Sequence, residues 1–294
     1  MKSGFVSILG KPNVGKSTLL NRLVGSKLAA VSKKPQTTRQ IIRGILTETR
    51  GQIVFLDTPG LHTPKDRFNE RMVNAAKTAY LDSDLIYWMV FPGFPKQEEM
   101  NILEDLKASE KPIVLLINKI DTLAKPNVLP VLDAYHKLYP FETIFPISVL
   151  HGDNLKELVE HTFQFLPEGS PYFPEDVTSD QTERFIVSEM IREKVFRFTV
   201  EEIPYASAVE INEFKERENG VTFIDATIFV ERDSQKKIII GTKGDAVKKI
   251  GTAARQDIET LLERKVFLQL WVKAKNDWKT DEQFLKRIEG SSPE

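Results

Sequence analysis

The stretch Gly-Lys-Pro-Asn-Val-Gly-Lys-Ser, residues 10–17, constrains the fold of this chain more than any other feature. It has the spacing GxxxxGK[ST], follows the apolar run Phe5–Leu9 and opens the amphipathic stretch Lys16–Val24. Between a strand and a helix, such a loop turns backbone N–H groups around phosphate oxygens, and the helix N-terminus adds further donors. The alternative is a glycine-rich turn that binds nothing. The predicted phosphate-binding residues are Gly10, Lys11, Pro12, Asn13, Val14, Gly15, Lys16, Ser17 and Thr18.

The first half of the chain alternates short apolar runs with amphipathic stretches, which favours βαβ units and a mainly parallel sheet. Ile41–Glu48 is expected to be an additional, antiparallel edge strand. The other predicted strands are Phe5–Leu9, Ile53–Leu56, Leu85–Val90, Ile113–Ile117 and Thr143–Pro146. The predicted helices are Lys16–Val24, Asn69–Leu81, Glu98–Ala108, Val128–Tyr139 and Asn154–Leu166.

Two motifs complete a site for a nucleoside triphosphate and Mg²⁺. In the loop, Lys16 would bridge the β- and γ-phosphates and the Ser17 hydroxyl would bind Mg²⁺. The sequence FLDTPG ends a predicted strand, so Asp57 would hold Mg²⁺ through a water and the Gly60 N–H would meet the γ-phosphate. Taken alone, Asp-Thr-Pro-Gly is equally typical of an ordinary β-turn.

Two further motifs point to guanine. INKID ends the next apolar strand, where the Asp121 carboxylate can accept from both N1–H and the N2 amino group of guanine. Adenine offers neither donor there and would leave the carboxylate unpaired, which penalises ATP. Lys119 would lie over the base, beside Asn118. In PISVL, we expect Ser148 and the amides of Val149 and Leu150 to contact guanine O6. Four motifs in order, each after a strand, predict GTP/GDP binding at one sheet edge.

The segment KPQTTRQ lies between the first two motifs and contains adjacent threonines. One of them could complete Mg²⁺ coordination only when a γ-phosphate is present. Thr38 is the first choice and Thr37 the second, against the alternative of a plain surface loop. Loss of the γ-phosphate would release this loop and the segment after Gly60, which is the order–disorder switch of nucleotide-driven proteins. Lys16, Thr38 and Gly60 are therefore the candidate catalytic residues for hydrolysis of GTP to GDP and phosphate.

The position after Gly60 is Leu61, where many small GTPases carry a glutamine that orients the attacking water. Leucine cannot do so, and His62 follows it. We therefore expect slow intrinsic turnover, with the missing group supplied by a monovalent cation, another part of the chain or a partner. The Asn13 carbonyl oxygen could help to hold K⁺ beside the phosphates.

The residues 166–176, LPEGSPYFPED, carry three prolines and a glycine and are typical of a linker. The predicted ranges are 1–168 for a GTP-binding domain, 169–180 for the linker and 181–294 for a second domain. In the second domain we expect a helix over Glu183–Thr199, strands over Ser207–Glu216 and Thr222–Glu231, a helix over Asp245–Glu263 and a strand over Val266–Lys273. This is a smaller α+β domain that follows an α/β domain.

A second glycine–lysine loop, GTKG at residues 241–244, lacks the first loop's spacing. A GxxG loop between two helices is typical of a KH domain, which clamps single-stranded nucleic acid; a simple helix-joining turn is the alternative. Residues 171–294 hold 20 Lys+Arg and 24 Asp+Glu, a net charge of −4, whereas residues 232–255 hold seven Lys+Arg and two Asp, a net charge of +5. Such a contrast indicates a localised nucleic-acid site. The candidate RNA-binding residues are Ile240, Gly241, Thr242, Lys243, Gly244, Lys248, Lys249 and Arg255, with Ile240, Val247 and Ile250 lining the groove for bases.

Composition narrows the remaining possibilities. The chain has no cysteine, which excludes disulfides, thiolate metal sites and cysteine nucleophiles, and its four histidines show no metal-ligand spacing. The apolar stretch Leu85–Phe91 is far shorter than the roughly 20 residues that span a bilayer. We therefore expect a cytoplasmic protein, and a peripheral association with the inner face of the membrane stays open.

Seven motifs together resemble the bacterial Era GTPase family over Gly4 to about Trp278. They are GKPNVGKS, PQTTR, DTPGLH, NKID, the PEGxPxFPED linker, VERDSQK and IIIGxKG. The resemblance implies a P-loop GTPase domain joined to a type II KH domain, binding near the 3′ end of the small-subunit ribosomal RNA and a role in 30S subunit assembly. The family usually has Ser-Ala where this chain has Ser148-Val149.

The leading hypothesis is a GTP-switched, RNA-binding assembly factor, expected to be a monomer, that uses GTP/GDP and Mg²⁺. An RNA-binding scaffold with a structural, slowly hydrolysing GTP site is the alternative. A third possibility, a GTPase of membranes or of tRNA modification, would be favoured by a membrane helix or a C-terminal cysteine, and the sequence shows neither.

Overall fold

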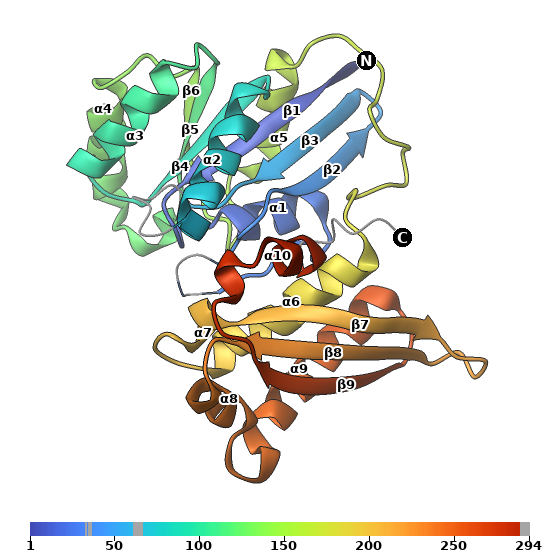
Figure 1. Ribbon diagram of the computed structural model, residues 1–294. Helices are drawn as coiled ribbons and strands as arrows, with labels where there is room; N and C mark the ends of the chain where they lie inside the picture. The colour runs from blue at the N-terminus through green and yellow to red at the C-terminus, as the bar shows by residue number, and fades with distance from the viewer. Residues whose placement is uncertain (33, 35–36, 61–66, 289–294) are drawn as a thin grey trace. The chain divides into compact units, whose positions relative to one another are not determined.

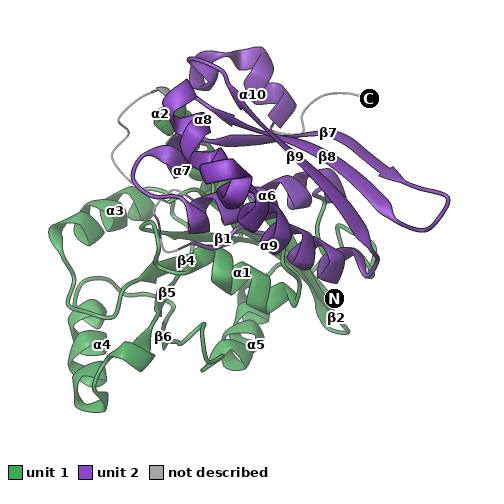
Figure 2. Cartoon of the chain, turned by 90° about the horizontal axis from the view of Figure 1, so that it is seen from below, with its two compact units in different colours: residues 1–28, 38–180 green, residues 29–37, 181–294 purple. Residues whose placement is uncertain are grey.

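The computed structural model describes residues 1–32, 34, 37–60 and 67–288 (Figure 1). The chain forms two compact units. The first comprises residues 1–28 and 38–180, and the second comprises residues 29–37 and 181–294 (Figure 2). Residues 29–37 thus group with the C-terminal part of the chain. The domain ranges expected from the sequence stay a prediction.

A six-stranded sheet forms the centre of the first unit, in the order β2-β3-β1-β4-β5-β6. β2 is antiparallel to β3, and the other neighbours are parallel. This confirms the mainly parallel sheet and its antiparallel edge strand. The strands are β1 (Lys2–Gly10), β2 (Ile42–Glu48), β3 (Gly51–Asp57), β4 (Leu85–Val90), β5 (Ile113–Ile117) and β6 (Thr143–Pro146).

Helices connect the parallel strands, as the alternating pattern predicts, whereas a short turn joins β2 to β3. They are α1 (Lys16–Val24), α2 (Arg67–Leu81), α3 (Gln97–Lys107), α4 (Val128–His136) and α5 (Leu155–Phe165), with short 3₁₀ turns η1 (Ile120–Thr122) and η2 (Lys125–Asn127). Helices and loops cover both faces of the sheet (Figure 1). Every residue of β4 and β5 is consequently buried, which explains why these strands are continuous apolar runs and do not alternate.

The proline-rich segment after α5 is bonded to the first unit. The Thr178 carbonyl accepts from the Ile45 N–H at 2.8 Å, and the Ser179 hydroxyl donates to the Arg43 carbonyl at 2.6 Å. The buried Gln52 side chain accepts from the N–H groups of Tyr172 and Phe173 at 2.9 and 3.0 Å. The segment up to Asp180 therefore packs as part of the first unit.

The second unit contains a three-stranded sheet in the order β7-β8-β9, with β7 and β8 antiparallel and β8 and β9 parallel. The order helix–strand–strand–helix–loop–helix–strand agrees with the sequence prediction. The sequence analysis did not predict α7 or α10. The elements are α6 (Glu183–Phe198), α7 (Ile203–Ala206), β7 (Ala208–Glu216), β8 (Thr222–Val230), α8 (Asp233–Ile240), η3 (Thr242–Gly244), α9 (Asp245–Leu262), β9 (Val266–Ala274), η4 (Trp278–Thr280) and α10 (Glu282–Ile288).

Helices α6 and α9 pack together on this sheet. The alternate residues Ile224, Ala226 and Ile228 of β8 are fully buried, so one face of this strand packs into the core. Gly220 has a φ of 74°, as the tight turn between β7 and β8 requires. Within the part of the chain that the structure describes, no helix combines the length and the apolar character that a membrane crossing needs.

We predict that Gln52→Leu destabilises the first unit. Leucine removes the buried acceptor that the backbone N–H groups of Tyr172 and Phe173 share, at a cost of about 1–3 kcal/mol in unfolding free energy. Gln164→Leu makes the same chemical change at an exposed position of α5 and is the matched control. Urea unfolding followed by circular dichroism measures both variants. Equal unfolding free energies for the two would contradict the role assigned to Gln52.

Candidate functional site

The sheet of the first unit brings the four N-terminal motifs to one edge. Residues 10–17 follow β1, residues 57–60 end β3, residues 118–121 follow β5 and residues 147–150 follow β6. Because these strands are parallel, their carboxyl ends lie at the same edge (Figure 1). Ligands of open α/β sheets bind at this edge. Polar groups that are far apart in sequence therefore converge here.

Residues 10–17 form the phosphate-type loop, which needs both of its glycines. Gly10 has a φ of 148°, and a Cβ there would lie 2.2 Å from the Met89 carbonyl oxygen. Gly15 has a φ of 117°, and its Cβ would lie 2.4 Å from Nδ2 of Asn118. Both conformations are strained for residues with side chains. The loop leads directly into α1, whose N-terminus begins at Lys16.

Lys16 lies inside this loop. Its Nζ donates to the carbonyl oxygens of Gly10 and Lys11, each at 3.1 Å. Burial lowers the pKa of Lys16 from its ordinary value to about 8, and the nearby Asp57 carboxylate opposes this shift. An anion bound beside Lys16 would favour its charged form. The loop thus places the Lys16 ammonium group beside the backbone N–H groups at the N-terminus of α1, where both can contact an anion.

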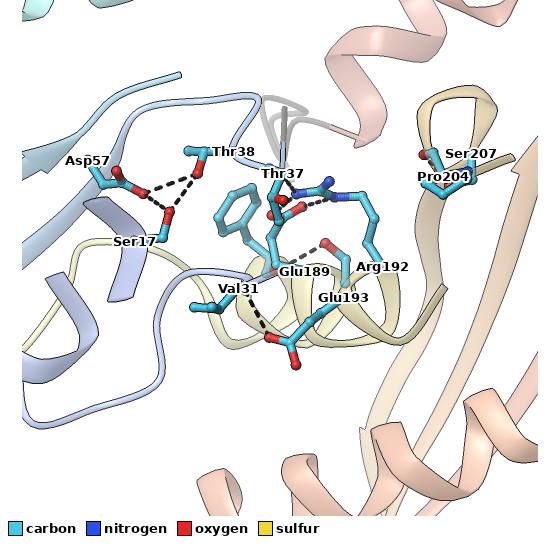
Figure 3. A network of polar contacts seen from close by, with 12 residues as sticks. Ser17, Val31, Thr37, Thr38, Asp57, Glu189, Arg192, Glu193, Pro204 and Ser207 are labelled. Atoms are coloured by element: carbon cyan, nitrogen blue, oxygen red, sulfur yellow. Dashed lines mark hydrogen bonds and ion pairs between the residues drawn. The ribbon is translucent and has the colours of Figure 1, made fainter. Parts of the chain in front are cut away.

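Three oxygen-bearing side chains meet next to the start of α1 (Figure 3). The Ser17 hydroxyl donates to Oδ2 of Asp57 at 2.6 Å and lies 2.7 Å from the Thr38 hydroxyl. The Thr38 hydroxyl donates to the same Asp57 oxygen at 3.2 Å. Thr37 does not join this group, because its hydroxyl donates to the Lys34 carbonyl at 2.9 Å. The geometry favours Thr38 of the two threonines.

These donors fit Mg²⁺. The ion prefers hard oxygen ligands and is commonly held by one or two carboxylates together with substrate phosphates. Ser17 and Thr38 offer hydroxyl oxygens, and Asp57 offers a fully buried carboxylate. Among the described residues, no group of three or more His, Cys, Asp or Glu side chains converges on one point. Mg²⁺ at this point would complete its shell with water molecules and with the oxygens of a bound ligand.

Asn118 ties the first loop to the last motif. Its side-chain amide donates to the Val14 carbonyl at 2.7 Å, and its Oδ1 accepts from the Val149 N–H at 3.0 Å. Asn118 is almost wholly buried, so both hydrogen bonds are shielded from water. One side chain thereby fixes the distance between the phosphate-type loop and residues 148–150.

Asp121 is oriented by Ser148. The buried Ser148 hydroxyl donates to Oδ1 of Asp121 at 2.6 Å, while Asp121 itself is exposed to solvent. Nζ of Lys119 donates to the Asn13 carbonyl at 2.8 Å and lies 4.8 Å from the centre of the Phe91 ring. Burial lowers the pKa of Lys119, against the attraction of Asp121. Together these contacts hold an acceptor-only carboxylate at the rim of the site.

The remaining predicted residues take different positions. Lys11 forms ion pairs with Glu98 and Glu99 of α3 at 2.6 and 2.7 Å, so its side chain points to that helix. Gly60 approaches the loop closely, since a Cβ on it would lie 2.9 Å from the Pro12 nitrogen. Leu150 is exposed. Leu61 and His62, on which the hydrolysis argument depends, lie outside the described residues.

The second predicted site, GTKG, joins α8 to α9. Gly241, Lys243 and Gly244 have φ values of 75°, 53° and 87°. A Cβ on Gly241 would lie 2.7 Å from Cβ of Ala246, so only glycine lets the loop fold back onto α9. Thr242 and Lys243 are exposed at its tip. Their backbone and side chains are therefore available to a ligand.

A groove of about 350 Å³ runs between α9 and β9 beside this loop. Val247, Lys248 and Arg255 line one side, and Phe267, Leu268 and Leu270 line the other. It combines cationic and apolar groups. The prediction that Ile250 lines the groove was wrong: Ile250 is fully buried, because it lies on the face of α9 that packs into the core. Lys249 is exposed and lines a second hollow of about 400 Å³ on α9.

Sequence reasoning missed two positioning roles at the first site. The Val149 amide, expected to face a ligand, donates to Asn118 Oδ1. Ser148 orients Asp121. Both hydrogen bonds join residues that are 27 or more positions apart. The one sequence signal for them is that each motif follows a parallel strand, which brings the motifs to the same edge of the sheet.

Comparison with known proteins gives two family matches. Residues 5–119 match the family described as 50S ribosome-binding GTPase, and residues 202–279 match the KH domain family. The chain is 52% identical to GTPase Era of Geobacter metallireducens, covering 98% of this chain and 97% of that protein. It is 46% identical to GTPase Era of Ruminiclostridium cellulolyticum, with 98% and 97% covered.

Two solved structures resemble the whole chain. One is a variant of Era from Aquifex aeolicus bound to GDP and AlF4⁻, with a TM-score of 0.94, 42% identity, and 98% of this chain and 99% of that chain covered. The other is Era in complex with MgGDPNP and nucleotides 1506–1542 of 16S ribosomal RNA, with a TM-score of 0.94, 42% identity and 98% of each chain covered. Full-length identity at this level, two family matches and a shared fold lead to one conclusion: the chain belongs to the GTPase Era family.

Proposed function

We propose that this protein hydrolyses GTP at the edge of the first unit's sheet and binds small-subunit ribosomal RNA through its second unit. The observation that carries the proposal is the Asn118 side chain, which joins the phosphate-type loop to the motif that orients Asp121. It holds a phosphate site and a purine-selecting carboxylate at a fixed separation. The role in 30S subunit assembly is part of the same proposal.

In this proposal, residues 10–18 surround the phosphates, and Lys16 bridges the β- and γ-phosphates. Backbone N–H groups and the start of α1 supply most of the donors. The Gly60 N–H contacts the γ-phosphate. Hydrolysis then depends on positioning and on charge stabilisation rather than on a general base.

Ser17 and Thr38 would bind Mg²⁺ directly, and Asp57 through a water. Bound Mg²⁺ would neutralise charge on the phosphate oxygens. Thr38 would join the shell only when the nucleotide has a γ-phosphate. This assignment is supported by the 2.7 Å and 3.2 Å contacts of Thr38 with Ser17 and Asp57.

Guanine would be read by Asp121, with the Leu150 amide near O6 and Lys119 over the ring. Asp121 accepts two hydrogen bonds from the guanine edge, and Ser148 holds it in that orientation. Since the Val149 N–H already donates to Asn118, its contribution is to the placement of the loop. Asn118 and Ser148 then act by positioning.

We predict that Asp121→Asn lowers GDP affinity by about 100- to 1000-fold, because the charge is lost and the asparagine amide turns a donor toward the N2 amino group of guanine. Asparagine offers one acceptor and one donor, which match the N1–H and the 2-carbonyl of xanthine, so XDP should bind the variant better than GDP does. Asp153→Asn makes the same charge change at a nearby exposed position and is the control. Calorimetry with both nucleotides measures the exchange. Unchanged GDP affinity in Asp121→Asn would refute the assignment.

RNA binding is proposed for GTKG and the groove between α9 and β9. The support is the solved Era complex with a 16S ribosomal RNA segment, together with the exposed loop and its basic neighbours. Gly241 and Gly244 allow the RNA backbone to approach, and Thr242 and Lys243 contact phosphates. Lys248, Lys249 and Arg255 add positive charge, and Ile240 adds apolar surface beside the loop.

We predict that Lys243→Glu weakens binding of a 3′ fragment of 16S ribosomal RNA by at least about tenfold, because a phosphate contact becomes a repulsion. Affinity for GDP should not change. Lys286→Glu reverses the charge of an exposed residue on α10 and serves as the matched control. Filter binding at fixed salt compares the variants. If both reversals weaken RNA binding equally, the loop is not the binding site.

Potassium, held with the help of the Asn13 side-chain carbonyl, would stabilise the developing charge at the phosphates and so replace the help of the glutamine that this chain lacks after Gly60. We predict that GTP hydrolysis is faster in KCl than in NaCl of equal ionic strength, as measured by phosphate release. Equal rates would contradict the K⁺ role.

The same assay tests the alternative function, an RNA-binding scaffold with a structural GTP site. Negligible phosphate release in both salts, with and without ribosomal RNA, would favour that alternative.

The proposed location is the cytoplasm, with the protein acting as a monomer on the 30S subunit. Peripheral association with the inner face of the membrane is kept as a further proposal. Co-sedimentation with 30S subunits or with lipid vesicles distinguishes these partners. Binding to vesicles without binding to 30S subunits would favour a GTPase that acts at the membrane.

A further inference from the structure

The segment 29–37 lies in sequence between the phosphate-type loop and β2, yet it is grouped with the second unit (Figure 2). The following residue, Thr38, belongs to the first unit and contacts Ser17 and Asp57. A single peptide bond therefore separates a residue held in the second unit from one at the proposed Mg²⁺ site.

Helix α6 binds this segment at both ends (Figure 3). Oε2 of Glu193 accepts from the Val31 N–H at 3.0 Å, and Nη2 of Arg192 donates to the Thr37 carbonyl. Both α6 side chains thus bond to backbone groups. Because backbone groups are held, the path of the chain into Thr38 is set.

Lys34 forms a third attachment. Its Nζ donates to the carbonyls of Phe196 and Thr199, at the C-terminal end of α6. Carbonyls at a helix C-terminus lack intrahelical donors and lie at the negative end of the helix dipole, so a lysine is favoured there. Side chains of α6 thus bind the backbone of the segment, and a side chain of the segment binds the backbone at the end of α6.

The α6 side chains are fixed in turn. Arg192 is 3% exposed, and its Nε donates to Oε1 of Glu189 at 2.7 Å. Glu193 is 7% exposed and pairs with Lys194 at 2.7 Å, and Lys194 also pairs with Asp257 of α9. Buried ionised groups are tolerated only when paired, which gives this cluster one defined arrangement.

We propose that Arg192 is a positioning residue for Thr38 in the GTP-bound state. Arg192 holds the Thr37 carbonyl and thereby presents the Thr38 hydroxyl to Mg²⁺. Binding of Val31, Lys34 and Thr37 to α6 and coordination by Thr38 then favour one another, and this coupling is reciprocal. The inference rests on the proposed nucleotide site and adds the residue through which the second unit responds to the γ-phosphate.

The test compares affinities for a non-hydrolysable GTP analogue and for GDP, both with Mg²⁺. Arg192→Met should lower the preference for the analogue by about 5- to 100-fold while GDP affinity stays unchanged. Arg197→Met removes an exposed arginine from the same helix and should leave the preference unchanged. Lys34→Met, which removes the third attachment, should act in the same direction as Arg192→Met.

A double-mutant cycle separates positioning from a merely structural role. Thr38→Val removes the hydroxyl on which Arg192 is proposed to act, so adding Arg192→Met should lower the preference no further. Three results would overturn the proposal. The losses of preference in Thr38→Val and Arg192→Met could add in the double variant, or Arg192→Met could weaken the analogue and GDP equally. The third is an unchanged preference in both Arg192→Met and Lys34→Met. If the unmodified protein does not bind GDP, the proposed function itself fails. GDP binding with an unchanged preference in both variants defeats only the role of Arg192.

Discussion

The Asn118 side chain is the constraint on which the organisation of the site depends. Its two hydrogen bonds, to the Val14 carbonyl and from the Val149 N–H, join loops that follow β1 and β6. Gly15 must lack a side chain because Asn118 occupies that space. A phosphate site and a purine site can be built separately on many folds, but recognition of one nucleotide requires a fixed distance between them. Buried hydrogen bonds from Asn118, the residue that follows a third strand, β5, provide that distance.

The second constraint is the position of residues 29–37. Thr38 completes the group with Ser17 and Asp57, while the residues before it bond to α6 of the second unit. On our proposal, a nucleotide-dependent change at Thr38 would be transmitted along the backbone to α6, which is ion-paired with α9 through Lys194 and Asp257. The GTKG loop leads directly into α9. The proposed RNA site therefore lies at the start of the helix that is ion-paired with α6.

Local patterns predicted most of the fold. Strands β4, β5 and β6 begin and end where their apolar runs do, and α1 spans the expected residues, because spacing and periodicity are local properties. The long-range pairings were not predictable. Arg192 and Thr37 are 155 positions apart, and Gln52 and Phe173 are 121 apart, and no periodic pattern marks either pair. The burial of Ile250 was missed because its neighbours Val247 and Gly251 line the groove while Ile250 itself packs into the core.

Selection of guanine by the Asp121 carboxylate is the central claim, because the assignment of the nucleotide, and the switch built on it, follow from that choice. The most direct measurement is calorimetric titration of the unmodified protein with GDP and with ADP in the presence of Mg²⁺. The account predicts that ADP binds at least about 100-fold more weakly, because adenine leaves the carboxylate without its two donors. Comparable affinities for the two nucleotides would contradict it.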